Sequence, residues 1–336
     1  MPVSINGNLG ITFPDGSLQV AAASPFGLRN RIINGDMVIS QRNGTSSVNN
    51  ATTFATGYTL DRFNCVGSQA SKFTTAQNAG SVTPPVGFTN YLGVTSSSAY
   101  TVLAGDYFNI IQPIEGFNVA DLAWGTANAR TVTLSFWVRS SLTGTFGGAL
   151  TNAGTNRSYP FTYSIPVANT WTSISVTIAG DTTGTWGTGN GVGIYVQFGL
   201  GVGSTYSGTA GAWAGAYYLS ATGSQSVVGT NGATFYITGV QLERNTTATP
   251  FEWIPYGQEL MLCQRYYEVN AYQIMSSGNY ASQNWQVAKR ASPTITIISG
   301  TGGTVGAMTG SPTTSYILTA YSASNNSLTI SGQAEL

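Results

Sequence analysis

The sequence predicts an all-β protein built around an antiparallel β-sandwich, and two observations carry this prediction. Glycine makes up 42 of the 336 residues, 42% of the residues are hydrophobic, 12% are aromatic and only 7% are charged. This is the composition of a folded, turn-rich chain with an uncharged polar surface, because disordered chains contain few hydrophobic and aromatic residues. Short segments of alternating apolar and polar residues also follow one another, separated by loops rich in Gly, Thr, Asn and Ser.

Residues 1–25 are expected to form a small N-terminal β-hairpin arm. The segment Gly10–Val20 (GITFPDGSLQV) places the turn sequence Pro14-Asp15-Gly16 between two short apolar alternations. An isolated hairpin is marginally stable in water, so its apolar side needs cover from another chain or from the next domain. We interpret the arm as an attachment and trimerisation segment, with a decorated terminal arm of a monomer as the alternative.

Residues 26–258 are expected to form the sandwich itself. Within Ala129–Ser141 (ARTVTLSFWVRSS), every second residue is apolar, which places one face of the strand in a core. The segments 171–180 and 191–200 alternate in the same way. In Ala233–Glu243 (ATFYITGVQLE) the alternation slips across Gly239, which predicts a β-bulge at that glycine.

Residues 259–336 are expected to form a small C-terminal β domain, joined to the sandwich by one short helix. The helical spacing of apolar residues in Tyr256–Glu268 (YGQELMLCQRYYE), which follows Pro255, predicts that helix. A second short helix-like stretch is Gly116–Gly125. The two cysteines, Cys65 and Cys263, have no C-x-x-C or histidine companion, so buried free thiols are expected, with a long-range disulfide as the alternative.

The absence of histidine excludes several kinds of chemistry. Ser-His-Asp hydrolysis, Cys-His proteolysis and His-zinc sites have no residue to use.

With two lysines and twelve positive against twelve negative charges, the chain has no basic surface for nucleic acid. No apolar run approaches 18 residues and no signal-peptide pattern is present, so neither membrane insertion nor export is expected. A glycosidase needs only two carboxylates, but the twelve acidic residues are dispersed, and we expect a protein that is not an enzyme.

Five aromatic residues in glycine-rich loops are the candidate glycan-binding residues. Sugars stack their C–H faces on aromatic rings and hydrogen-bond to amides, hydroxyls and backbone groups, so such a site needs no charge. The alternative is that these rings plug the ends of the sandwich or pack against a neighbouring subunit. The candidates are Trp186, Tyr206, Trp213, Tyr217 and Tyr218. Three tryptophans on strands or in the junction are expected to be packing residues: Trp137, Trp171 and Trp253.

Several long strings, in the same order along the chain, resemble a bacteriophage tail-fibre or virion-surface structural protein. They include RNRIINGDMVISQRNG (Arg29–Gly44), YTLDRF (Tyr58–Phe63), ATFYITGVQLE, TPFEWIPYGQEL and LCQRYYE, and the resemblance covers roughly residues 26–290. It implies a virion protein assembled in the host cytoplasm, a homotrimer that contacts other virion proteins through residues 1–25 and host surface polysaccharide through its sandwich.

The NGDM sequence that ends at Met37 and the FYITGVQLE sequence that ends at Glu243 also resemble jelly-roll carbohydrate-binding modules. This second resemblance implies a jelly-roll sandwich and a structural calcium ion held by Asp36 and Glu243. The chain departs from the family pattern at Thr238-Gly239, where these modules usually have acidic residues. No other cofactor is expected.

Three functions follow from these observations. The leading hypothesis is a non-enzymatic phage fibre protein that contacts host-surface glycans for host attachment. The alternative is a purely structural decoration protein of head, neck or tail that binds no glycan. The third is a tail spike that degrades polysaccharide, which requires a pair of catalytic carboxylates.

Overall fold

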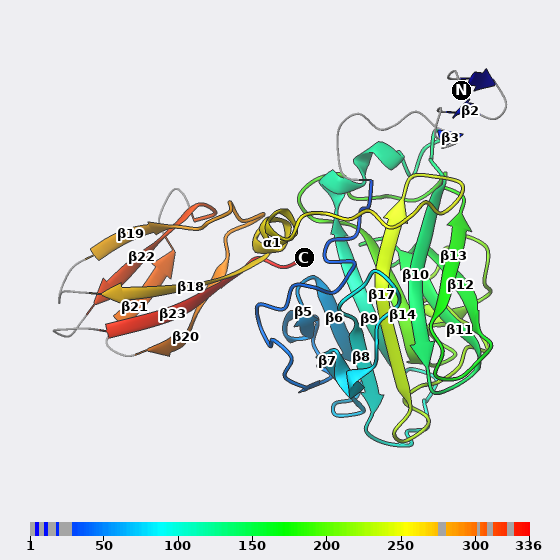
Figure 1. Cartoon of the computed structure of the whole chain (residues 1–336), viewed down its shortest axis with the longest axis horizontal. Coiled ribbons are helices and arrows are strands. Elements are labelled where there is room, and N and C mark those ends of the chain that lie inside the picture. Colours follow the sequence, from blue (N-terminus) through cyan, green and yellow to red (C-terminus); the bar gives the residue numbers. More distant parts are fainter. Residues whose placement is uncertain are drawn as a thin grey trace.

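Two six-stranded antiparallel sheets face each other in the computed structural model and form the main body of the protein (Figure 1). The structure describes residues 4–6, 10–12, 18–19, 29–274, 280–300, 303–307, 312–320 and 326–336. A smaller group of C-terminal strands lies beyond the helix α1, and the chain's C-terminal end lies between the two bodies (Figure 1). The predicted all-β jelly-roll sandwich, with an N-terminal β arm, a small C-terminal β part and a junction helix, is confirmed.

The sandwich consists of sheet I and sheet II. Sheet I has the order β13-β10-β17-β8-β7-β4, with bounds Thr172–Ile178, Val132–Ser140, Thr234–Glu243, Leu92–Ser96, Phe73–Gln77 and Val48–Asn49. Sheet II has the order β12-β11-β14-β9-β6-β5, with bounds Ser158–Ile165, Gly144–Thr151, Val192–Val202, Tyr107–Glu115, Phe63–Gly67 and Tyr58–Leu60. Only the pairs β7-β8, β11-β12 and β5-β6 join consecutive strands, and all other neighbours are non-consecutive, as expected for a jelly roll.

The alternating residues of both sheets meet in one core. In β10 the predicted apolar face is buried, and Phe136 of sheet I packs on Phe198 of sheet II with 5.0 Å between ring centroids. The predicted bulge at Gly239 is also present. Gly239 has a φ of +61°, and the register between β10 and β17 shifts there. The extra residue returns Val240 to the core face that Ile237 occupies, so the bulge keeps the whole of β17 in register with the core.

A long loop between β14 and β17 covers part of the outer face of sheet II. It carries the short parallel strands β15 (Ser207–Gly208) and β16 (Ser220–Ala221). Ser220 lies so close to the sheet that a Cβ at Gly199 would meet its Oγ at 2.8 Å. The loop therefore rests directly on glycines of sheet II and leaves the neighbouring part of that face uncovered.

The C-terminal part contains the helix α1 (Tyr256–Gln264) and two three-stranded antiparallel sheets. Their orders are β18-β23-β20 and β19-β22-β21, with bounds Tyr267–Ile274, Asn326–Gln333, Thr294–Gly300, Tyr280–Asn284, Ser315–Ala320 and Gly303–Ala307. The helix is shorter than the predicted Tyr256–Glu268, because its last residues already belong to β18. Within this part, Lys289 and Glu268 form an ion pair whose side chains are both fully buried.

The remaining elements are short. The N-terminal strands β1 (Ser4–Asn6), β2 (Gly10–Thr12) and β3 (Leu18–Gln19) form one antiparallel sheet, and the predicted turn at residues 14–16 lies outside the described residues. Four 3₁₀ helices are described: η1 (Phe54–Thr56), η2 (Ala79–Ser81), η3 (Gly116–Asn118) and η4 (Ala120–Leu122). The last two occupy the helix-like stretch seen in the sequence.

Cys65 and Cys263 are free and buried, as expected. No helix in the described part of the chain is long and apolar enough to cross a membrane.

A buried guanidinium joins the sandwich to the C-terminal end of the chain. Arg62 is 1% exposed, forms an ion pair with Glu335, and donates to the carbonyl of Pro113 at 2.6 Å. Its guanidinium lies 3.6 Å from the ring centroid of Tyr266. Glu335 also pairs with Arg42 at 3.0 Å, and Asp61 lies 3.7 Å from the Arg42 guanidinium, so two carboxylates balance two cations of the sandwich. Buried charges of this kind are tolerated only when they are paired.

We predict that Glu335→Ala lowers the free energy of unfolding by about 3 kcal/mol, because the change leaves Arg62 buried without its counter-ion. Asp121→Ala is the matched control, since Asp121 is 41% exposed in its pair with Arg31 and the loss should stay below about 1 kcal/mol. Urea unfolding of both variants tests this. Equal, small losses would show that the buried pair does not hold the junction.

Candidate functional site

A cleft of about 230 Å³ opens on the outer face of sheet II, beside the loop between β14 and β17. Strands supply its floor, the long loop supplies one wall, and η1 contributes to the other wall. It is lined by Phe54, Val66, Tyr107, Ile111, Thr155, Tyr195, Gln197, Tyr206, Tyr217 and Leu219. Six of these ten side chains are aromatic or amide groups, and none is an acid or a strong base.

The floor of the cleft follows from strand alternation. In β14, Val196 and Phe198 point into the core, so Tyr195 and Gln197 lie on the opposite face. The same rule places Ile111 of β9 on the outer face, where it is the ladder partner of Gln197. The residues that build the core therefore also fix which residues form the floor.

The walls are rows of aromatic rings in edge-to-face contact. Tyr107 meets Tyr206 with 5.7 Å between ring centroids, and Tyr206 meets Tyr217 at 6.0 Å. On the other side, Phe54 meets Tyr195 at 5.8 Å. Edge-to-face pairs hold one another in orientation, so the cleft has preformed aromatic sides.

Backbone contacts fix the loop that carries Tyr206. A Cβ at Gly203 would collide with the carbonyl oxygen of Leu103, so glycine permits the loop to approach the sheet here. Thr205 then donates its N–H to the Ala104 carbonyl at 2.9 Å, and Leu219 donates to the Tyr206 carbonyl at 2.7 Å. The two ends of the aromatic wall are thus tied to each other and to the strand edge.

The polar groups of the cleft are neutral and include one amide atom without a partner. Gln197 is 1% exposed, and its Nε2 donates to the hydroxyl of Thr151 at 2.8 Å. Its Oε1 is buried and accepts no hydrogen bond. Burial and the neighbouring tyrosines raise the pKa of Tyr217 to about 12, and burial raises the pKa of Tyr195. Both phenols are therefore protonated near pH 7 and can donate or accept hydrogen bonds.

The structure brings together two of the five predicted aromatic residues, Tyr206 and Tyr217, in this cleft. Tyr218 is instead half-buried against Gly208, where a Cβ on the glycine would collide with its ring. The other eight lining residues were not among the sequence candidates, and four of the eight carry aromatic or amide side chains: Phe54, Tyr107, Tyr195 and Gln197. The signal for Tyr195 and Gln197 was present, because both stand on the non-core face of the predicted strand at 191–200.

Trp186 and Trp213 lie elsewhere, in a cluster with Trp124 beside the core of the sandwich. Their ring centroids are 5.4 Å apart, and both contact Trp124 at about 5 Å (4.8 and 5.2 Å). Both indole N–H groups donate to backbone carbonyls, of Thr183 and Ala179 respectively. The adjoining cavity measures about 10 Å³, which is the space of one water molecule.

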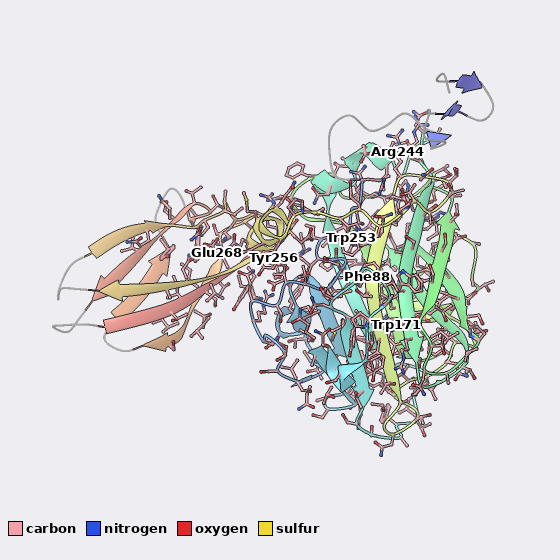
Figure 2. The ribbon with its side chains drawn as sticks, in the orientation of Figure 1. Phe88, Trp171, Arg244, Trp253, Tyr256 and Glu268 are labelled. Atoms are coloured by element: carbon pink, nitrogen blue, oxygen red, sulfur yellow. The ribbon has the colours of Figure 1, made fainter. Side chains whose placement is uncertain are left out.

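The outer face of sheet I carries a second group of aromatic rings. Phe88, Phe251 and Trp253 contact one another, with ring centroids 4.9–5.2 Å apart. Figure 2 shows Trp253, Phe88 and Trp171 following one another over the region of β17. Trp171 and Trp137 are half-buried, as expected for packing residues, but Trp253 differs because it is 55% exposed.

The carboxylates of Asp36 and Glu243 do not line a common cavity. Glu243 is buried and accepts hydrogen bonds from Thr249 N at 2.8 Å and from Gln241 Nε2 at 3.0 Å. Asp36 lines a different, polar pocket of about 10 Å³. Within the described ranges, no group of three or more His, Cys, Asp or Glu side chains is arranged to hold a metal ion. The calcium ion that the resemblance implies at Asp36 and Glu243 stays a prediction.

The small polar pocket instead gathers three acidic residues, Asp36, Glu252 and Glu259. Glu259 lies on α1 and accepts a hydrogen bond from the backbone N–H of Asn34, so it fastens the junction helix to the sandwich. Burial raises the pKa of Glu259 to about 7, and the charges of Asp36 and Glu252 act in the same direction. Burial likewise raises the pKa of Asp36.

No family model matches the sequence, and no curated protein matches it. Among solved structures, the chain is similar to the enzymatically active domain of tailspike protein 4 from bacteriophage CBA120, with a TM-score of 0.35 and 12% identity over 64% of this chain and 21% of that chain. The chain thus spans about a fifth of that tailspike structure. TmCBM61 in complex with β-1,4-galactotriose gives a TM-score of 0.32 and 12% identity, over 65% of this chain and 100% of that chain. The family 11 carbohydrate-binding module from Clostridium thermocellum gives 0.30 and 11%, over 58% and 95%.

We predict that the free energy of unfolding falls as the pH rises from about 4.5 to about 7, because the unfolded chain ionises Glu259 in this window while the folded chain keeps it protonated. A raised pKa of this size corresponds to a loss on the order of 3 kcal/mol. Glu259→Gln keeps a neutral acceptor for Asn34 and should be more stable than the wild type at pH 8 but not at pH 4. Urea unfolding at the two pH values measures this, and an equal gain at both would contradict it.

Proposed function

We propose that this chain is a carbohydrate-binding protein that holds a glycan in the cleft on sheet II. The observation that carries the proposal is the preformed set of aromatic walls around a neutral polar floor. Rings at the walls offer surfaces for the C–H faces of a sugar, and Gln197 with the tyrosine hydroxyls offers hydrogen-bond partners for its hydroxyl groups. A volume of about 230 Å³ is slightly below the roughly 300–1,000 Å³ of drug-sized sites and suits one sugar ring.

The proposed function is binding without hydrolysis. A glycosidase needs two carboxylates about 5–10 Å apart at the scissile bond, and the cleft lining contains no Asp or Glu. The acidic residues Asp36, Glu252 and Glu259 do lie together, but their pocket of about 10 Å³ admits no more than a water molecule. This supports the fibre hypothesis over a polysaccharide-degrading spike.

We place this binding activity in a non-enzymatic fibre protein of a phage virion that contacts host-surface polysaccharide. Support for the virion role comes from the sequence strings, chiefly Arg29–Gly44 and Ala233–Glu243, which resemble phage fibre proteins. The alternative is a purely structural decoration protein, in which the same cleft would remain unused. Binding of the purified protein to a panel of bacterial surface polysaccharides separates the two.

We predict that Tyr206→Ala and Tyr217→Ala each weaken glycan binding at least tenfold, about 1.4 kcal/mol, because each removes a stacking surface from the cleft. Isothermal titration with the best polysaccharide of the panel measures the change. Trp253→Ala is the matched control, since it removes an exposed ring from the opposite sheet and should leave binding unchanged. If Trp253→Ala alone abolishes binding, the site lies on sheet I instead.

We also predict that the full-length protein is a trimer, in line with the resemblance to fibre proteins and with the N-terminal strands of residues 4–19, which form a small sheet of their own. Light scattering should give three times the chain mass of 35.1 kDa. Deletion of residues 1–25 should reduce the number of chains in the oligomer. A mass of one chain for the intact protein would contradict the prediction.

A further inference from the structure

Resting on the proposed function, we infer that the cleft selects uncharged sugars and that the buried amide of Gln197 accepts a hydrogen bond from a ligand hydroxyl. Uronic acids, sialic acids and phosphorylated sugars are excluded. Bacterial surface polysaccharides include both neutral and acidic chains, and only the neutral chains are expected to bind in the cleft. It follows from the unpartnered amide oxygen and from the charges around the cleft.

Gln197 has a fixed orientation and unused hydrogen-bonding capacity. It lies in the middle of sheet II, with Ala149 and Ile111 as its ladder partners on either side. Thr151 is fully buried and engages Nε2 of the amide, while Oε1 is buried without a partner in a side chain that lines the cleft. A buried amide oxygen without a partner destabilises the unliganded protein, and a hydrogen bond donated by a ligand removes that cost.

A sugar hydroxyl can form a hydrogen bond with the free end of the amide in either orientation of the amide. Thr151 Oγ1 can accept from Nε2 or donate to Oε1, so one end of the amide is left without a protein partner in either case. Sugar hydroxyls both donate and accept, and therefore match either orientation. A carboxylate only accepts, so it would meet the oxygen with repulsion in the orientation observed.

The charges nearest to the cleft are already paired and cannot serve an acidic sugar. Arg157 follows Thr155 at the cleft rim, but its guanidinium makes two hydrogen bonds of 2.7 Å to Asp181. Asp106 precedes Tyr107, and its carboxylate accepts from Ser68 Oγ and Leu103 N. A carboxylate that enters the cleft would lose its hydration without gaining a cation, which opposes its binding.

The cleft wall has the same neutral character. Asn109, two residues before Ile111 on β9, is fully buried and donates its Nδ2 to the carbonyl of Leu219 at 3.2 Å. This bond holds Leu219 as an apolar wall opposite Gln197. Neither wall nor floor therefore carries a positive charge, and binding should be insensitive to salt.

The test uses the full-length protein and pairs of oligosaccharides with the same linkage, one neutral and one composed of the matching uronic acid. Isothermal titration measures both members of each pair at low and high NaCl. We expect at least tenfold weaker binding of the uronic acid member and no salt dependence for the neutral one. Tighter binding of the uronic acid member, or equal binding of the two, overturns the inference while leaving carbohydrate binding intact.

Gln197→Met keeps the length of the side chain and removes the amide. It should weaken binding of the neutral sugar at least tenfold without lowering the unfolding temperature. Gln225→Met is the matched control, since Gln225 is exposed and outside the cleft lining, and its binding should equal that of the wild type. Unchanged affinity of Gln197→Met overturns the role of the amide. Failure of the wild type to bind either member of any pair overturns the proposed function and the inference together.

Discussion

Every strand has two faces, and the core between the two sheets occupies one face of each strand. This constraint organises the whole sandwich. It places Phe136 and Phe198 in contact, and it requires the bulge at Gly239, without which the end of β17 would turn its apolar residues outward. It also decides what stands on the outer face of sheet II. Tyr195 and Gln197 form the cleft floor because their neighbours in β14 are core residues.

Scarcity of charge is the second organising feature. The chain has 24 charged residues, and several of them meet at the junction of the sandwich and the C-terminal strands. Arg62 and Arg42 share Glu335, and Arg265 holds Glu115 with hydrogen bonds of 2.6 and 2.9 Å. Since these side chains are largely buried, their pairing is specific and is weakly screened by salt. Charge therefore serves to join the parts of the chain, while the cleft remains neutral.

The sequence was sufficient for the fold but only partly for the site. Alternation and glycine-rich loops predicted the sandwich, the bulge and the strands, because these depend on local period and on turn chemistry. Tyr206 and Tyr217 were identified as candidates by composition alone. Tyr107 and Phe54 were not, because they reach the cleft through strand pairing between distant segments, which no local pattern records. Trp186 and Trp213 share the loop composition of the cleft tyrosines, and only the tertiary packing on Trp124 separates the two groups.

The cleft is formed by strands of the sandwich and by one loop. Its floor belongs to β9 and β14 and cannot change without disturbing the core, whereas Tyr206, Tyr217 and Leu219 belong to the single loop between β14 and β17. Gly203 brings that loop against the sandwich before Tyr206, and the contact of Ala214 with Ser158 ties it again between Tyr206 and Tyr217. Exchange of the loop residues between Gly203 and β17 would change this wall while leaving the strands of the floor in place. If the cleft holds a glycan as proposed, one short stretch of the gene determines the wall that the glycan meets.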